Sequence, residues 1–117
     1  MADLKVYRLI IRLDEKTKNG ELKWESTITG GEFQVSFKDY SVGIVEYDNR
    51  RTNVIDMHLK IYDSKGELIE VASDTDFQDN PHTPKAYDMF ASIYDGARRM
   101  ALGVDDALDA ILSELAP

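Results

Sequence analysis

The acidic residues of segment 73–83 are the side chains in this sequence most suited to binding a metal ion. Asp74, Asp76 and Asp79 lie close together there, and carboxylates at alternate positions of a loop can supply oxygen ligands to calcium. The spacing departs from the calcium-loop template, because position 78 is Gln and neither the expected glycine nor the closing glutamate follows. We therefore interpret the cluster as an acidic turn that caps and solvates the backbone, and we predict no metal site.

The two histidines are the next candidates for metal binding or acid–base catalysis. His58 and His82 lie in no paired spacing that would form a zinc site. We expect His58 on the polar face of a strand and His82 in the loop that precedes a helix. A Ser-His-Asp triad stays open, because the fold rather than the sequence assembles triads, but Gly-x-Ser-x-Gly is absent. With 22 acidic residues, no carboxylate pair stands out, and we assign no catalytic or cofactor-binding residue and no cofactor.

Three other features resemble binding motifs and have structural explanations. Gly30-Gly31 matches neither phosphate-binding glycine pattern and precedes a strand, so it predicts a hairpin turn. Five aromatic residues on or beside the strands could stack on RNA bases. Such a stacking surface normally has cations beside it, and here the nearby cations are only Arg50-Arg51 and scattered lysines. We therefore favour core packing and cross-strand pairing for these aromatic residues. These aromatic residues are Phe33, Phe37, Tyr40, Tyr47 and Tyr62. Arg98-Arg99 could bind an anion or an acidic partner, although a position at a helix C-terminus explains at least one of them.

Length and composition predict one folded domain. The chain has 117 residues, near the usual size of a single domain, and no linker, repeat or low-complexity tract divides it, so we predict one domain over residues 1–117. Cysteine is absent, which excludes disulfides and thiolate chemistry and favours a reducing compartment, the cytoplasm. The N-terminal residues show no export signal. No run of roughly 18 apolar residues predicts a membrane span.

The charge distribution bears on the kind of partner. The chain has 14 basic and 22 acidic residues, and residues 73–117 contain nine of the acidic and three of the basic ones. Such a negative field repels phosphate backbones, so we expect no direct binding to nucleic acid. Solubility explains an acidic surface in general, and a basic protein partner attracted by the field is the functional alternative.

The N-terminal segment, residues 4–18, has two interpretations. We prefer a helix that Asp3 caps and that Asn19-Gly20 ends. Its apolar face is formed by Val6, Leu9, Ile10, Leu13 and Thr17. The alternation of Tyr7, Leu9, Ile11 and Leu13 with Arg8, Arg12 and Asp14 also fits a strand. A strand paired with residues 21–28 therefore stays open as the alternative.

From residue 21 the apolar pattern has a period of two, which is typical of half-buried strands. We expect five strands joined by short turns into an antiparallel meander. The strands are expected near Leu22–Trp24, Phe33–Phe37, Val42–Tyr47, Ile55–Ile61 and Leu68–Val71. The glycine of Asp63-Ser64-Lys65-Gly66 predicts a tight hairpin before the fifth strand. Residues 73–83 are rich in turn formers and predict a loop.

The C-terminal part predicts two amphipathic helices. Thr83-Pro84 is typical of a helix start, and Gly103 of a helix end. The apolar stripe of the first helix is formed by Phe90, Ile93, Tyr94, Ala97 and Ala101. A short second helix begins near Asp105-Asp106. Its stripe consists of Leu108, Ile111, Leu112 and Leu115. We expect both stripes to pack on one face of the sheet, which gives an α+β fold.

Three blocks of the sequence resemble a pattern found in small uncharacterised bacterial proteins. The blocks are residues 14–24, 61–69 and 97–109. The resemblance implies the order helix, β-meander, helix, and it implies no activity and no functional residue.

Two functional hypotheses follow. The first is a non-enzymatic, acidic protein-interaction domain of an accessory, antitoxin-like or immunity-like kind that binds a basic protein. The second is a small-molecule binder or weak enzyme with a pocket between sheet and helix, lined by Trp24, Tyr62 and Tyr94. Assembly into a homo-oligomer through a sheet edge or the C-terminal helix is a third interpretation. The sequence does not identify the residues that would bind a partner.

Overall fold

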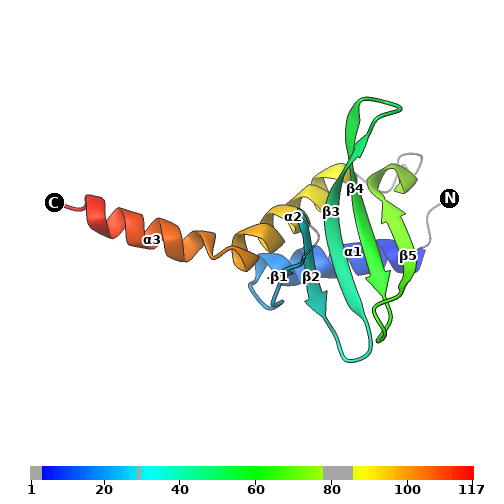
Figure 1. The fold of residues 1–117 in the computed structure, drawn as a ribbon, viewed down its shortest axis with the longest axis horizontal. Coiled ribbons are helices and arrows are strands. Elements are labelled where there is room, and N and C mark those ends of the chain that lie inside the picture. The colour runs from blue at the N-terminus through cyan, green and yellow to red at the C-terminus, as the bar shows by residue number, and fades with distance from the viewer. Residues whose placement is uncertain (1–3, 29, 78–85) are drawn as a thin grey trace.

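The computed structural model describes residues 4–28, 30–77 and 86–117. It contains an N-terminal helix, a five-stranded antiparallel sheet and two C-terminal helices, so the predicted α+β class and order of elements are confirmed (Figure 1). The elements are α1 (Leu4–Lys18), β1 (Glu25–Ser26), β2 (Glu32–Ser36), β3 (Ser41–Asn49), β4 (Val54–Tyr62), β5 (Leu68–Ser73), the 3-10 helix η1 (Asp74–Phe77), α2 (Ala86–Ala101) and α3 (Val104–Leu115).

The sheet is a meander in which each strand pairs with its neighbours in the chain, in the order β1-β2-β3-β4-β5. The register places Phe33, Ile44 and Leu59 side by side, because Phe33 pairs with Ile44 and Ile44 with Leu59. All three are buried, so the alternation in the sequence does define a single apolar face. The predicted hairpin before β5 is present, with Gly66 at φ 82° and its amide bonded to the carbonyl of Asp63 at 3.0 Å.

Residues 4–18 form a helix, so the strand alternative for this segment is wrong. Ile10, Leu13 and Thr17 are the buried residues of α1, and they lie at the spacing of three and four that one helical face requires. The helix packs on α2 at a point of close approach, because a β-carbon on Gly96 would lie 2.5 Å from Cγ2 of Thr17. The alternation in the sequence fits a strand locally, but only the helical spacing buries these three residues together.

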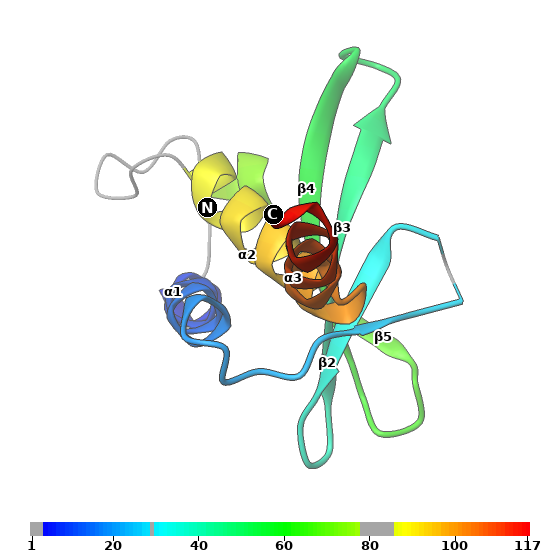
Figure 2. The same cartoon turned by 90° about the vertical axis from the view of Figure 1, so that its left-hand side faces the viewer.

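Helix α2 lies between the sheet and α1, and it forms the centre of the core. Phe90, Ile93 and Ala97 have no exposed surface. The ring of Phe90 contacts Phe77 of η1 at a centroid distance of 6.1 Å, and Phe77 contacts Tyr7 of α1 at 5.9 Å. Figure 2 shows α1 and α2 on the same side of the sheet. The core is therefore built from one sheet face, α2 and α1 in succession.

Two predicted segments differ in detail from the structure. The first strand lies beyond the residues expected for it: Glu25 and Ser26 pair with β2, whereas Leu22–Trp24 form no strand. The reason is that Trp24 turns toward the helices, where it is 2% exposed and its Nε1 donates to Oγ1 of Thr17 at 3.1 Å. The predicted loop at 73–83 begins as the end of β5 and the turn of η1. The predicted helix start at Thr83-Pro84 lies outside the described residues.

Helix α3 is arranged differently from the expected packing on the sheet. It contacts α2 and extends away from the sheet (Figure 1), and none of its residues is buried. Gly103, at φ 63° and ψ 38°, ends α2 and starts α3, a left-handed conformation that glycine adopts without strain. The Cα radius of gyration is 15.6 Å, larger than the roughly 13 Å usual for a compact domain of this length. The apolar stripe of α3 is therefore left in solvent.

Candidate functional site

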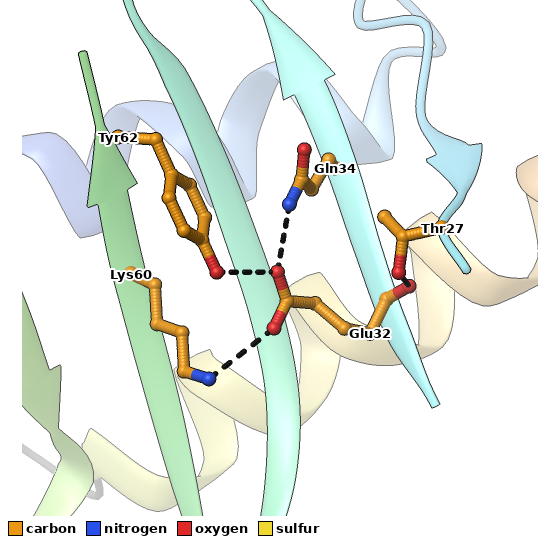
Figure 3. A network of polar contacts seen from close by, with 5 residues as sticks. All are labelled: Thr27, Glu32, Gln34, Lys60 and Tyr62. Carbon is orange, nitrogen blue, oxygen red and sulfur yellow. Dashed lines mark hydrogen bonds and ion pairs between the residues drawn. The ribbon is translucent and has the colours of Figure 1, made fainter. Parts of the chain in front are cut away.

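A polar network lies on the face of the sheet opposite the helices. The ring of Phe33 contacts that of Tyr94 in α2 at 5.6 Å, so the neighbouring residues Glu32 and Gln34 point to the helix-free face. The carboxylate oxygen Oε2 of Glu32 accepts hydrogen bonds from the hydroxyl of Tyr62 at 2.7 Å and from Nε2 of Gln34 at 2.8 Å (Figure 3). Its other oxygen, Oε1, lies 3.3 Å from Nζ of Lys60. The side chains come from β2 and β4, on either side of β3.

Gly43 of β3 explains how a carboxylate can lie flat across the sheet. A β-carbon at this position would come within 2.6 Å of Oε2 of Glu32 and within 3.3 Å of the ring of Tyr62. Because glycine leaves that volume empty, Glu32 crosses β3 and reaches Tyr62 and Lys60 on β4 (Figure 3). Glu32 is only 3% exposed as a result, and both of its carboxylate oxygens have partners.

The pKa values of the network show that it is not prepared for acid–base catalysis at neutral pH. Burial raises the pKa of Glu32, but the hydrogen bonds from Gln34 and Tyr62 and the charge of Lys60 outweigh burial, so the pKa falls below 4.5. Burial, and then the hydrogen bond to Glu32, raises the pKa of Tyr62 from 10.0 to about 12. The carboxylate stays ionised and the phenol stays neutral, whereas a general base or acid works best with a pKa near the operating pH. The network connects β2 to β4 across β3.

The predicted position of His58 is correct, since it lies half-buried on the helix-free face of β4, two residues before Lys60. Its ring stacks on that of Tyr47 at a centroid distance of 4.6 Å and an interplanar angle of 13°. His82 lies outside the described residues. Within residues 4–28, 30–77 and 86–117, no three His, Cys, Asp or Glu side chains come together in a way that could hold a metal ion.

The acidic side chains near the end of β5 accept hydrogen bonds from backbone amides. Oδ1 of Asp74 accepts from the amide of Met57 at 2.8 Å, and Oδ2 of Asp76 accepts from the amide of Ser73 at 2.8 Å. These bonds agree with the predicted capping role of the two residues, and Asp79 lies outside the described residues. Glu70 acts in the same way, because its Oε1 accepts from the amide of Val71 at 3.1 Å. Carboxylates thus occupy backbone donors along β5, an edge strand that would otherwise offer them to another chain.

The pocket expected between sheet and helix does not form around the three aromatic residues proposed for it. Trp24 is buried against Thr17, Tyr94 faces Phe33 on the helix side, and Tyr62 bonds Glu32 on the opposite face. Trp24 and Tyr94 lie on the helix side, and the sheet separates Tyr62 from both.

The remaining candidates have internal roles. Gly30-Gly31 lies in the connection between β1 and β2, with Gly31 at φ 84°, which agrees with the predicted turn. Arg98 pairs with Asp95 at 2.8 Å, and Arg99 pairs with Asp105 at 2.5 Å. Of the other aromatics, Phe33 is buried, Tyr47 stacks on His58, and Phe37 and Tyr40 are exposed.

An open hollow of about 410 Å³ lies where α1, α2 and α3 meet, and its lining includes Thr17, Gly96, Arg99 and Asp105. The two charged side chains among these form the ion pair just described. Two further charged residues line the hollow: Lys18 pairs with Asp14 at 3.1 Å, and Asp106 is exposed in the first turn of α3.

The most unusual surface is the apolar stripe of α3. Leu108, Ile111, Leu112 and Leu115 are 45%, 53%, 64% and 75% exposed. The helix contains four acidic and no basic residues, and with 3.6 residues per turn Asp109 and Glu114 fall on opposite sides of the stripe. The sequence showed the stripe and the charges, but not that the stripe lacks a partner within the chain.

The chain has no helix long and apolar enough to cross a membrane among the residues that the structure describes. In comparisons with known proteins, no family model matches the sequence, and no curated protein or solved structure is significantly similar to it.

Proposed function

We propose that this chain is a non-enzymatic, cytoplasmic protein-interaction domain of the accessory, antitoxin-like or immunity-like kind, and that α3 binds a basic protein partner. The observation that supports this proposal is the exposed stripe of Leu108, Ile111, Leu112 and Leu115. The partner offers an apolar groove with a positively charged rim, and α3 lies in the groove as an amphipathic helix.

The energetic argument begins with the stripe itself. Burial of a Leu or Ile side chain contributes about 1.5–3 kcal/mol relative to exposure, and α3 leaves four such side chains largely in water. A helix of 12 residues is marginal in water without packing on one of its faces. A partner that covers the stripe would therefore stabilise both the complex and the helix.

The charges of α3 determine which partner fits. Asp105 and Asp106 lie in its first turn, where the positive end of the helix dipole stabilises their negative charges. Asp109 and Glu114 flank the stripe and have no ion-pair partner within the described residues. A basic rim would pair with these two carboxylates, whereas an acidic surface would be repelled.

The test compares two adjacent positions of α3 that receive the same new charge. Ile111→Glu places a carboxylate in the stripe, and Ala110→Glu places one on the opposite side of the helix. A photo-crosslinking residue at position 112 captures partners from a reducing lysate at low ionic strength, and each captured protein is then purified and titrated against the variants. We expect a basic protein whose affinity falls with salt, is lost in Ile111→Glu and is kept in Ala110→Glu.

Three results would contradict the proposal. A heterologous partner that is acidic, or affinity that does not change with salt, would show that the carboxylates of α3 do not select the partner. Equal loss of binding in both variants would show that the stripe has no special part. The absence of any crosslinked protein at low ionic strength would count against a partner of this chemistry.

A further inference from the structure

The β3–β4 hairpin extends past the rest of the sheet as a two-stranded arm. Strand β2 pairs with β3 only as far as Val45, and β5 pairs with β4 only as far as His58. Residues 46–57, which we call the arm, therefore pair as strands only with one another (Figures 1 and 2). A two-stranded ribbon is marginally stable alone and gains from packing against another surface.

The arm has an apolar and aromatic surface on the helix-free side of the sheet. Tyr47 stacks on His58, so both point to that side, and Val54, four residues before His58 in β4, shares it. Tyr47 is 48% and Val54 56% exposed. Farther down the same face, Val71 pairs with Lys60 and is 39% exposed. No helix of the described chain covers this face (Figure 2).

The charged residues in the turn of the arm are positive, in contrast to the net charge of the chain as a whole. Arg50 and Arg51 are exposed in the turn of the arm. Of the acidic residues of the arm, Glu46 and Asp48 pair with Met57 and Ile55 on the helix side. Asp56 pairs with Tyr47 on the helix-free side and is only 8% exposed. An apolar surface with basic residues at its end is the complement of α3.

We infer that a second copy of this chain covers the α3 stripe, with α3 of each copy lying on the helix-free face of the other copy's arm. This inference rests on the proposed function in that it uses the same stripe: the second copy covers α3 until the basic partner displaces it. The 12 residues of α3 span about 18 Å, and the nine residues of β4 span about 30 Å, so α3 extends from the arm over the adjoining part of the same sheet face. Apolar side chains meet apolar side chains, and Asp109 and Glu114 approach Arg50 and Arg51.

The arrangement of the two surfaces favours a second copy over contact within one chain. The arm and α3 lie at different ends of the molecule and point apart (Figure 1), so α3 does not reach the arm of its own copy. Each copy carries one of each surface, and a reciprocal exchange closes a two-fold dimer. Direct pairing of two α3 helices is disfavoured, because it would bring eight carboxylates together with no basic residue on either helix.

The test reverses the charges on each surface and then mixes the variants. We expect the wild type to sediment as a dimer of twice 13.3 kDa, more weakly at high salt. The variant R50E/R51E and the variant D109K/E114K should each be monomeric, with dimer dissociation constants raised about tenfold or more. An equimolar mixture should form a heterodimer, because both contacts are again between opposite charges. The control K38E/K65E makes the same charge change in two exposed turns and should stay dimeric.

A second measurement does not depend on charge reversal and uses the absence of cysteine from the chain. Single-cysteine variants L112C and V54C, mixed and treated with a short bifunctional thiol reagent, should give a covalent dimer. A mixture of L112C with K38C should not. A monomeric wild type at all concentrations, failure of the charge-reversed pair to associate, or equal crosslinking to V54C and K38C would overturn the inference.

The measurements can disprove the dimer and the proposed function independently of each other. R50E/R51E leaves α3 unchanged, so a basic partner that depends on Ile111 should still bind this variant. A wild type that stays monomeric but binds a basic partner through Ile111 would disprove the inference alone. Retention of the dimer without any partner would disprove the proposed function alone.

Discussion

The carboxylate of Glu32 lies across the backbone of Gly43, where a β-carbon would come within 2.6 Å of Oε2. Glu32 on β2 and Tyr62 on β4 are 30 residues apart and bond across the strand between them at 2.7 Å. The missing side chain at position 43 allows a charged group to be almost fully buried on a sheet face that carries no helix.

We expect Gly43→Ala to destabilise the protein by about 1–3 kcal/mol, because the methyl group displaces Glu32 and leaves buried polar atoms without partners. The free energy of unfolding in urea measures the effect. Gly30→Ala is the matched control, since no atom lies within 4 Å of a β-carbon there. An equal loss in both variants would show that the Glu32 contact does not matter.

The raised pKa of Tyr62 predicts an alkaline loss of stability. Its pKa is about 12 in the folded chain and 10.0 as the reference, so the unfolded chain loses the proton first as pH rises. The contribution of the neutral phenol is complete below pH 10.0 and decreases between 10.0 and about 12. Urea unfolding across this range should show a smaller decrease for Tyr62→Phe than for the wild type and for Tyr40→Phe. Parallel curves for all three would contradict the prediction.

The lowered pKa of Glu32 predicts a loss of stability as the pH falls, whereas the raised pKa of Tyr62 predicts a loss as the pH rises. The ionised form is favoured in the folded state, so its contribution is present above pH 4.5 and is lost as pH falls through the lower folded pKa. Glu32→Gln should lower stability at neutral pH, because it leaves Lys60 without its charge partner, and should flatten the acid limb. Glu25→Gln, at an exposed position of β1, provides the control. An unchanged acid limb in Glu32→Gln would rule out this linkage.

The carboxylates along β5 predict a role in preventing aggregation. Glu70→Ala combined with Asp76→Ala frees the amides of Val71 and Ser73, and an edge strand with free donors pairs with other chains. We expect faster growth of light scattering on mild heating than for the wild type. Glu67→Ala removes a neighbouring exposed carboxylate that accepts none of these bonds. Similar aggregation in the Glu67→Ala control would assign the effect to lost charge instead.

The helix positions and the sheet order could be predicted because each depends on periodicity close in the chain. The burial of Leu59 and Met57 follows from alternation along β4, and the left-handed Gly66 follows from the turn sequence. The position of β1 after Trp24 could not be predicted, since it depends on Thr17, seven residues away, as the bonding partner of Trp24.

By itself the sequence determined the α+β class, four of the five strands and the polar face of β4, because the period of apolar residues selects helix or strand locally. The tertiary structure alone decided which residues meet across strands, as Glu32 and Tyr62 do, and which apolar stripe lacks cover. The stripes of α2 and α3 are alike in the sequence, but the helix-side face of the sheet is covered by α2. The left-handed turn at Gly103 carries α3 away from the sheet, so its leucines remain in water.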